Sequence, residues 1–295
     1  MILDQQTNVC YLSKRLIERE DGMEIAAIIM AHDVDVRFLE LTRDIWARDY
    51  MPIQIDVNEF VGFEYCPDYL YCDGYINTIT NQARVCACMG IDVLHSGLIL
   101  DGGNVVKTSR GVIMVDKVIR ENKHLRRVRV IDSLEKIFQT EVILLPWDRE
   151  EIYGHADGIV REISHGKVLL TNYSRYSPRL AKQFEHILSK RFDVEMLEFN
   201  VEKQHSHNWC YINYLQIGNQ LFLPQLTPMR LDSRSQANSK YKFDYLQTGK
   251  NVVEDEIAVE RFRNLLPDCE IIPISCPRIV KDGGALNCIS WNIKI

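Results

Sequence analysis

Long apolar runs are missing from this chain of 295 residues. No segment approaches the ~18 consecutive uncharged residues that a membrane-spanning helix needs. The start, Met1-Ile2-Leu3-Asp4-Gln5-Gln6, lacks the basic and apolar regions of a secretion signal. We therefore expect a cytoplasmic protein that has no membrane partner.

An excess of positive charge is also missing. The formal net charge is -6 and the isoelectric point is about 5.8, which argues against a protein that holds nucleic acid by a large basic field. One basic run stands out, and a solvated strand or loop face explains it better than a polyanion site. Its residues are Arg120, Lys123, His124, Arg126, Arg127 and Arg129.

Cysteine is not scarce, but the pairing that disulfides or zinc would need is missing. The chain has 9 cysteines, an odd number scattered along it, which fits a reducing cytoplasm better than a disulfide framework. Cys86 and Cys88, with Cys66 and Cys72 upstream, lack the spacing of structural zinc sites, and we expect a packed helix there. His205-Ser206-His207 lacks the remaining ligands in sequence. We expect no metal site.

A linker is missing too, because no Ser/Gly/Pro-rich or low-complexity stretch divides the chain. We therefore expect one catalytic domain over residues 1–295. Within it, five segments of helical periodicity are each followed by a short apolar strand, and hairpin-like strand pairs lie between successive helices. The unit recurs about five times at roughly 50–75 residues, the range in which propeller-like arrays occur.

The expected elements place every repeat in the same order. The helices cover about 13–31 with Ser13 as N-cap, about 74–89, a segment from Asp132, a segment capped by Ser177, and a segment ending at Pro267. The strands after them cover 36–41, 93–100, 142–145, 194–199 and 271–275. The hairpins pair 52–57 with 60–65, 104–107 with 112–118, 158–162 with 168–173, and 210–217 with 221–226. In a radial array, the junctions between strand and hairpin can all face one central site.

Four of these junctions carry chemically active groups. They are Trp46-Ala47-Arg48-Asp49-Tyr50-Met51-Pro52, Leu100-Asp101-Gly102-Gly103-Asn104, Gly154-His155-Ala156-Asp157-Gly158 and Gly283-Gly284-Ala285-Leu286-Asn287-Cys288. Taken singly, each has an ordinary explanation as a turn, a satisfied loop histidine or a buried cysteine. Their shared position in the repeat predicts a common site.

Together, these groups fit a nucleophilic reaction on a planar cation. Cys288 can supply a thiolate, and His155 can donate and accept a proton near neutral pH. Asp101 could hold the far ring nitrogen of His155. Asp49 and Asp157 are surplus to acyl transfer, which needs hydrogen-bond donors for an oxyanion. They suit a guanidinium, whose parallel N–H groups match a carboxylate.

The same residues resemble a known family. The set W-x-R-D, D-G-G-N, H-x-D-G and G-G-x-x-x-C, in this order from about Val9 onward, is similar to the agmatine deiminase and bacterial peptidylarginine deiminase family. Tyr211-Ile212-Asn213 and Leu223-Pro224-Gln225 look like the fourth-blade strands of that family. The resemblance implies the α/β pentein fold, a five-bladed α/β propeller with pseudo-fivefold repeats around a central active site.

The resemblance also implies roles for the junction residues. Cys288 would attack the guanidinium carbon, and His155 would protonate the departing ammonia and then activate water to hydrolyse a thiouronium intermediate. Asp49 and Asp157 would bind guanidinium nitrogens, and Asp101 would pair with His155. Further candidates for substrate binding are Trp46, which would line the entrance, Arg48 and Asn104.

The partner implied by the resemblance is a small guanidine. Agmatine comes first, and its conversion to N-carbamoylputrescine and ammonia would belong to putrescine and polyamine biosynthesis. No metal or organic cofactor is implied. The sequence leaves a homo-oligomer open.

Several positions depart from the usual pattern of the family. Tyr50-Met51-Pro52 stands where Thr-Gly-Pro is frequent, Asn287 stands where His commonly precedes the nucleophile, and Asp101 stands where many relatives have Glu. The Trp-rich opening of agmatine deiminases is missing as well. His155 is the matched acid and base, so Asn287 leaves the mechanism intact and bears on the substrate. Asp101 keeps a carboxylate with a shorter reach, and the missing opening bears on how the distal amine of agmatine is recognised.

Other functions stay open. Free or peptidyl arginine follows agmatine as a substrate, and an amidinotransferase would use an amine acceptor in place of water. A papain-like cysteine hydrolase would leave Asp49 and Asp157 without a role. A non-catalytic binding module on the same fold would have no reason to keep Cys288 and His155 together with those carboxylates.

Overall fold

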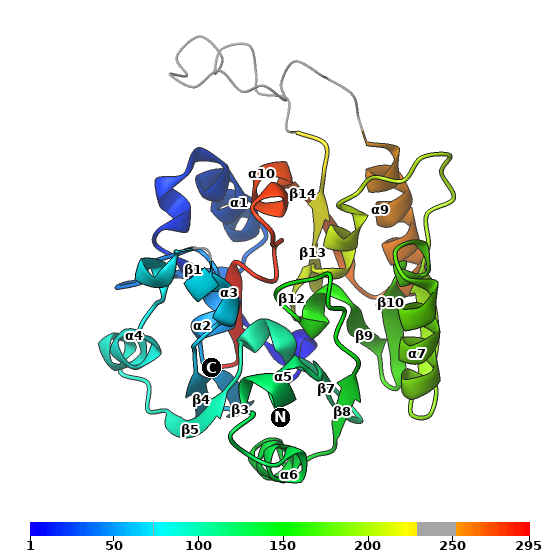
Figure 1. The fold of residues 1–295 in the computed structure, drawn as a ribbon. Coiled ribbons are helices and arrows are strands. Elements are labelled where there is room, and N and C mark those ends of the chain that lie inside the picture. Colours follow the sequence, from blue (N-terminus) through cyan, green and yellow to red (C-terminus); the bar gives the residue numbers. More distant parts are fainter. Residues whose placement is uncertain (73, 229–251) are drawn as a thin grey trace.

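The computed structural model describes residues 1–72, 74–228 and 252–295. In these ranges the strands form five separate three-stranded sheets. Five helices follow one another around the outside in chain order (Figure 1). They are α1 (Glu20–Ala31), α4 (Gln82–Met89), α6 (Arg127–Phe138), α7 (Pro178–Leu188) and α9 (Val253–Leu265). The five-bladed α/β propeller is thereby confirmed.

Every blade has the same strand pattern. The middle strand is antiparallel to the first strand and parallel to the third. A parallel pair needs a long crossover, and one of the five helices supplies it in each blade. The first blade consists of β15 (Ser290–Ile293), β1 (Val9–Ser13) and β2 (Asp35–Leu39), and the second of β3 (Ile53–Asp56), β4 (Glu59–Glu64) and β5 (Leu94–Ile99). The third consists of β6 (Val106–Thr108), β7 (Gly111–Val115) and β8 (Val142–Leu145), and the fourth of β9 (Val160–Ser164), β10 (Lys167–Thr171) and β11 (Asp193–Leu197). The fifth consists of β12 (Leu215–Ile217), β13 (Gln220–Gln225) and β14 (Glu270–Ser275).

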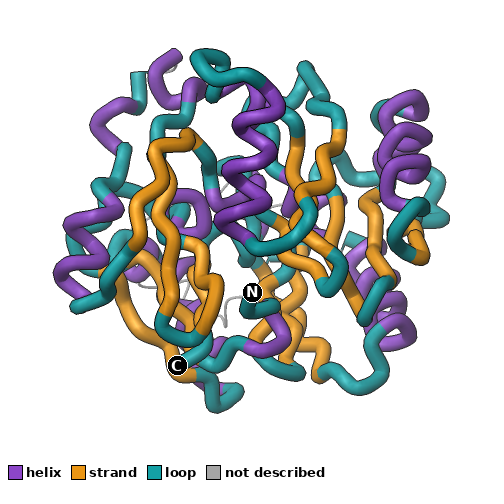
Figure 2. The backbone as a smooth tube through the Cα atoms, turned by 90° about the horizontal axis from the view of Figure 1, so that it is seen from below, coloured by secondary structure: helices purple, strands orange, loops and turns teal. Residues whose placement is uncertain are grey.

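The apolar core lies where each helix covers its blade. In the fourth blade, Phe184 and Leu188 of α7 are fully buried against Val168 and Leu170 of β10. Seen from below, strands surround a middle region in which the N-terminus lies (Figure 2). None of the helices in the described ranges is both long enough and apolar enough to span a membrane.

The last strand of the chain completes the first blade. β15 pairs with β1 through Val9 with Ile293 and Tyr11 with Trp291. The Trp291 indole N–H donates to the Pro52 carbonyl at 2.7 Å, and its ring centroid lies 5.8 Å from that of Phe60 in the second blade. The ring of blades is therefore closed by a strand that begins two residues after Cys288.

Some expected elements begin elsewhere. Ser13 is not a helix cap but the last residue of β1, where its hydroxyl donates to the Asp44 carbonyl at 2.7 Å. Asp132 lies inside α6, which begins at Arg127. The basic run is therefore divided: Lys123, His124 and Arg126 lie in the loop between α5 (Lys117–Glu121) and α6, while its other residues lie on these two helices. The second expected helix is shorter, because Asn81 caps α4 by accepting from the Arg84 amide at 3.0 Å.

Other boundaries agree with the sequence patterns. Ser177 caps α7 through the Leu180 amide, and α9 ends at Leu265, ahead of Pro267. β8 covers the expected four residues. The expected strand over 210–217 is split, since η7 (Asn208–Ile212) is a 3-10 helix and only Leu215–Ile217 is a strand.

Replacing Trp291 tests the ring closure. Trp291→Ala removes a fully enclosed ring and the hydrogen bond to Pro52, so we expect the free energy of unfolding to fall by about 3–5 kcal/mol. Urea unfolding followed by circular dichroism measures the loss. Val128→Ala, at an exposed position of α6, should change stability by less than about 0.5 kcal/mol. Equal effects of the two substitutions would contradict closure by β15.

Candidate active site

Short helical turns begin the blades and face one another around the middle. They are α2 (Ala47–Tyr50), η4 (Gly102–Asn104), η5 (Ala156–Gly158) and η7. Consecutive turns contact each other, α2 with η4, η4 with η5, and η5 with η7. Because the candidate residues lie on or beside these turns, the repeat brings Asp49, Asp101, His155 and Asp157 together with Cys288.

His155 lies between two carboxylates. Its Nε2 is 3.2 Å from Asp101 Oδ2, and its Nδ1 is 3.7 Å from Asp49 Oδ1. The Gly103 amide donates to Asp49 Oδ1 at 3.0 Å and fixes that carboxylate. A Cβ on Gly103 would lie 2.6 Å from His155 Nδ1 and 2.7 Å from Asp49 Oδ1. The close approach of these groups therefore requires glycine at this turn.

The carboxylates keep the imidazole of His155 protonated. Burial opposes the charged form, but Asp49, Asp101 and Asp157 together raise the pKa of His155 to about 10. Burial raises the pKa of Asp49 to about 7, against the lowering effect of the His155 charge. At neutral pH the site thus holds an imidazolium that can act as a proton donor.

Cys288 is buried beside a carboxylate and an amide. Its Sγ lies 3.2 Å from Asn213 Oδ1 and 3.9 Å from Asp157 Oδ2. Burial, followed by the negative charges of Asp157 and Asp49, raises the pKa of Cys288 well above its usual range. The empty site therefore favours the neutral thiol, and a bound cation would shift the balance toward the thiolate.

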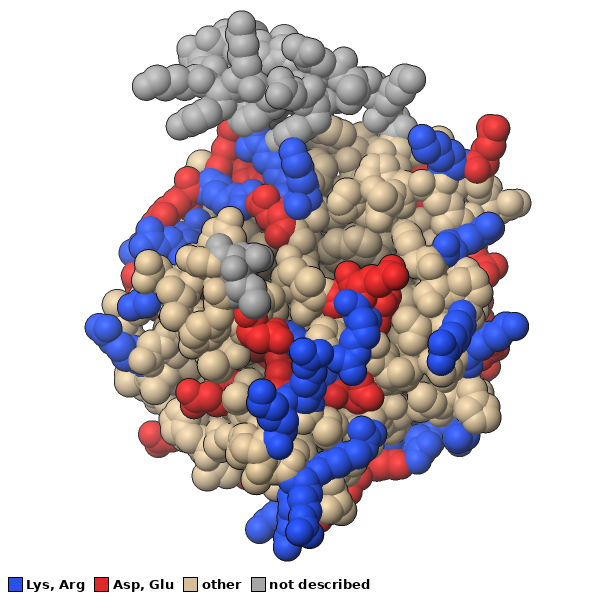
Figure 3. All heavy atoms as spheres, in the orientation of Figure 1, with Lys and Arg blue, Asp and Glu red and all other residues tan. Residues whose placement is uncertain are grey.

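Cys288, His155 and Asp157 open onto one cavity of about 470 Å³. Its walls combine aromatic rings with acidic side chains, and a hollow bordered by acidic groups is visible on this face (Figure 3). The aromatic residues are Trp147, Tyr153, Tyr173, Tyr176 and Trp209, and the acidic ones beyond Asp157 are Asp148, Glu150 and Glu151. Lys281 also lines the cavity, but the four carboxylates outnumber it and the His155 imidazolium, so the fixed charges around the nucleophile candidate favour a cation.

Trp46, Arg48 and Asn104 hold parts of the site in place. A Cβ on Gly284 would come within 2.3 Å of the Trp46 ring, so that ring packs against the turn before Cys288. The Arg48 amide donates to the Cys288 carbonyl at 3.1 Å. The Asn104 side chain accepts from the Val115 amide at 2.7 Å and donates to its carbonyl at 3.1 Å. None of these three lines the 470 Å³ cavity.

The family model of the Porphyromonas-type peptidyl-arginine deiminases matches residues 5–293. The chain belongs to this family. A Vibrio parahaemolyticus protein with the name "Putative agmatine deiminase" is 24% identical over 296 residues, covering 88% of this chain and 78% of that protein.

Solved structures confirm the pentein fold. An agmatine deiminase from C. jejuni superposes with a TM-score of 0.70 at 16% identity, covering 100% of this chain and 95% of the other. An Enterococcus faecalis agmatine deiminase gives a TM-score of 0.70 at 16% identity, with 99% and 95% covered.

Two further residues of this family member contact the site and were not expected from the sequence. Asn213 follows η7 and touches Cys288 Sγ. The Tyr69 hydroxyl, on α3 (Asp68–Cys72), donates to Asp101 Oδ2 at 3.1 Å. Asn213 lies at the junction that begins the fifth blade, ahead of β12, and not in the fourth blade as expected. The repeat that marked the other four motifs therefore contained the signal for it. Tyr69 lies in the crossover between β4 and β5 of the second blade, and no sequence pattern marks it.

Two short segments, Cys86–Cys88 and His205–His207, contain residue types that commonly bind metal ions. Cys86 is buried and Cys88 is exposed on α4. His207 lines the cavity, and its amide donates to His205 Nδ1 at 3.2 Å. In the described part of the chain, no group of three or more His, Cys, Asp or Glu side chains is arranged to hold a metal ion.

Replacing Asp101 tests the charge balance at His155. Asp101→Asn removes one of the carboxylates that stabilise the imidazolium, so we expect the pKa of His155 to fall from about 10. NMR titration of the ring nitrogens measures it. Because the pKa of His155 is higher in the folded state, its protonation stabilises the fold. This stabilisation is complete below pH 6.5 and is lost as pH rises through about 10. The variant should therefore lose part of this pH dependence, and an unchanged His155 titration would contradict the assignment.

Proposed function

We propose that this protein is a hydrolase that deiminates a guanidinium substrate, with agmatine as the first candidate. The observation that carries the proposal is a buried thiol beside the Asp157 carboxylate, with a second buried carboxylate, Asp49, close enough to act on it electrostatically. Asp49 and Asp157 are both buried, and both act electrostatically on Cys288 and His155. The relatives named as agmatine deiminases support the same substrate class.

A bound guanidinium would reverse the electrostatics of the empty site. Its positive charge offsets the carboxylates that raise the pKa of the Cys288 thiol. The thiolate then becomes accessible near neutral pH, in contact with the substrate carbon. Cys288 therefore becomes a nucleophile when a cation is present, which makes the reaction selective for cations.

The chemistry divides into two balanced steps. In the first, the Cys288 sulfur–carbon bond forms and a carbon–nitrogen bond breaks, while the His155 imidazolium gives its proton to the departing ammonia. In the second, the neutral His155 takes a proton from water, a carbon–oxygen bond forms and the sulfur–carbon bond breaks. The proton released when the carbon–hydroxyl group becomes a carbonyl goes to the ammonia, so the sum is guanidinium plus water giving a ureido product plus ammonium.

Replacing the nucleophile and the proton donor tests the two steps. With agmatine, Cys288→Ala should give no ureido product, and His155→Ala should lower kcat by about 10²–10⁴-fold. A coupled ammonia assay and mass spectrometry of the product measure both. Cys88→Ala, at an exposed position on α4, should keep wild-type activity, and circular dichroism should show that all variants fold.

The substrate panel separates the alternatives. Agmatine, free arginine and an arginine-containing peptide should be compared, with and without an amine acceptor. Transfer of the amidino group to that acceptor, in place of ammonia and a ureido product, would indicate an amidinotransferase. If folded wild-type protein acted on no guanidine, the deiminase proposal would fail.

Replacing a carboxylate tests cation recognition. Asp49→Asn keeps the shape but removes a charge, so we expect kcat/KM for a guanidine to fall by about tenfold to a hundredfold. Steady-state kinetics on the best substrate of the panel measures the loss. Cleavage of a peptide bond that survived Asp49→Ala would instead support a papain-like hydrolase, in which this carboxylate has no role.

A further inference from the structure

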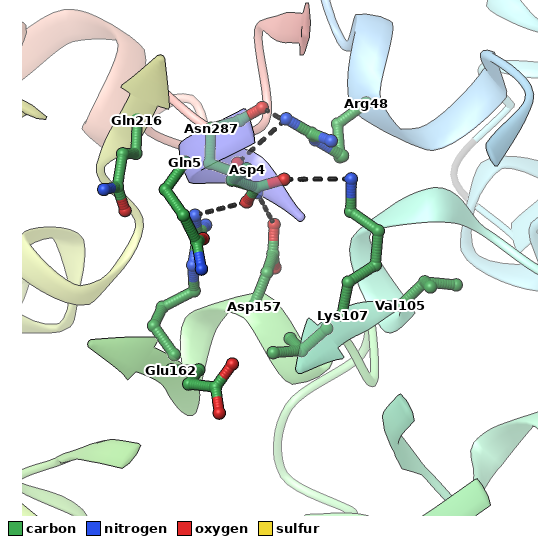
Figure 4. Close-up of a pocket in the computed structure, with 11 residues that line it drawn as sticks. Asp4, Gln5, Arg48, Val105, Lys107, Asp157, Glu162, Gln216 and Asn287 are labelled. Atoms are coloured by element: carbon green, nitrogen blue, oxygen red, sulfur yellow. Dashed lines mark hydrogen bonds and ion pairs between the residues drawn. The ribbon is translucent and has the colours of Figure 1, made fainter. Parts of the chain in front are cut away.

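Asn287, the residue before Cys288, bridges two charged groups (Figure 4). Its Oδ1 accepts from Arg48 Nη2 at 3.0 Å, and its Nδ2 donates to Asp157 Oδ2 at 2.7 Å. The Asn287 amide also donates to the Asn213 carbonyl at 3.1 Å. With 3% of its surface exposed, the side chain is held at both ends and enclosed.

Arg48 determines which way this amide points. A guanidinium has only donors, so it must meet the carbonyl oxygen of Asn287 and leave the NH₂ group for Asp157. Arg48 is itself fixed, because its Nη2 also donates to Asn292 Oδ1 at 2.5 Å. The neighbouring carboxylate of Asp4 binds Lys107 at 3.0 Å and Arg161 at 2.7 Å (Figure 4).

The bridge acts on the carboxylate nearest the nucleophile candidate. The Asp157 oxygen that accepts from Asn287 is also the oxygen 3.9 Å from Cys288 Sγ. Recognition of a planar cation by its paired N–H groups depends on the plane in which the carboxylate is held. A hydrogen bond from a fixed donor selects that plane before the substrate arrives.

We propose that Asn287 is a positioning residue, which bridges Arg48 to Asp157 and so holds the Asp157 carboxylate in the orientation that receives a guanidinium beside Cys288. The inference rests on the proposed function. It also accounts for Asn at a position where the family commonly has His. A neutral imidazole, like an amide, has one acceptor and one donor on different atoms, and can make the same bridge.

The test uses two electrophiles of nearly the same shape. 2-Chloroacetamidine is a planar cation and 2-chloroacetamide is neutral, and both alkylate a thiolate by forming a sulfur–carbon bond with loss of chloride. The quantity measured is the ratio of their alkylation rates at Cys288, obtained by peptide mass spectrometry. The exposed Cys88 of the same chain is the internal reference. In the wild type, we expect a ratio at Cys288 at least about tenfold above that at Cys88.

Two matched variants separate positioning from general damage. Asn287→Ala removes the donor to Asp157, and we expect the ratio at Cys288 to fall at least about tenfold. Asn292→Ala removes the other side-chain amide that accepts from Arg48 but leaves the Asn287 donor to Asp157 in place, so it should lower the ratio by less than Asn287→Ala does. Asn287→His should retain most of the ratio. If Asn287→Ala does not fold, Asn287→Ser, whose hydroxyl is too short for the bridge, replaces it.

The outcomes distinguish the two proposals. A wild-type ratio at Cys288 no higher than at Cys88 would show that the site does not select a planar cation, and both proposals would fail. A high wild-type ratio that survives in the folded Asn287→Ala or Asn287→Ser variant would overturn the positioning role alone. An equal loss in Asn292→Ala would also overturn it, because that variant keeps the Asn287 side chain that donates to Asp157.

Discussion

The mutual repulsion of buried carboxylates is the constraint on which this site depends. Asp49, Asp101 and Asp157 are all buried, and the other two carboxylates oppose ionisation of Asp49. A protonated His155 offsets this charge, since it contacts Asp49 and Asp101 directly. Charges that are costly to bury are retained where they perturb pKa values for chemistry.

The propeller fold brings these charged side chains together at one place. Each blade begins with a short turn that faces the middle, so side chains from distant parts of the sequence meet without a long loop. The first blade is completed by β15, which is continuous with the turn that carries Cys288. Closing the ring and placing the nucleophile candidate are therefore a single structural event.

The fold could be predicted from the sequence because every repeat contains local signals for its helix and strands. Ser177 and Pro178 mark the start of α7, and Pro267 marks the end of α9, because caps and helix breakers act locally. The predicted start of α1 at Ser13 was wrong, since a serine in a strand can donate its hydroxyl hydrogen to a remote carbonyl, here that of Asp44. The first strand itself pairs with residues near the other end of the chain, and nothing local predicts such a partner.

The site, like the fold, was predictable where the repeat marks it and not where it depends on contacts between distant segments. Asp49, Asp101, His155 and Cys288 stand at equivalent junctions, and that equivalence is visible in the sequence. The contact of Tyr69 with Asp101 depends on how the crossover between β4 and β5 folds back, which no periodicity encodes. Asn287 was visible only as an unusual residue, because its bridge needs Arg48 from a segment more than two hundred residues away.

The resting state of the site follows from these charges and bears on selectivity. With the site empty, burial and then the acidic surroundings hold the Cys288 thiol protonated, and the carboxylates hold the His155 ring charged. A neutral molecule that enters the cavity leaves this balance unchanged and meets a weak nucleophile. Under the proposed function, a guanidinium brings the positive charge that the thiolate needs, so the substrate activates the residue that attacks it. Selectivity and reactivity then have one cause, the surplus of negative charge that the fold concentrates around Cys288.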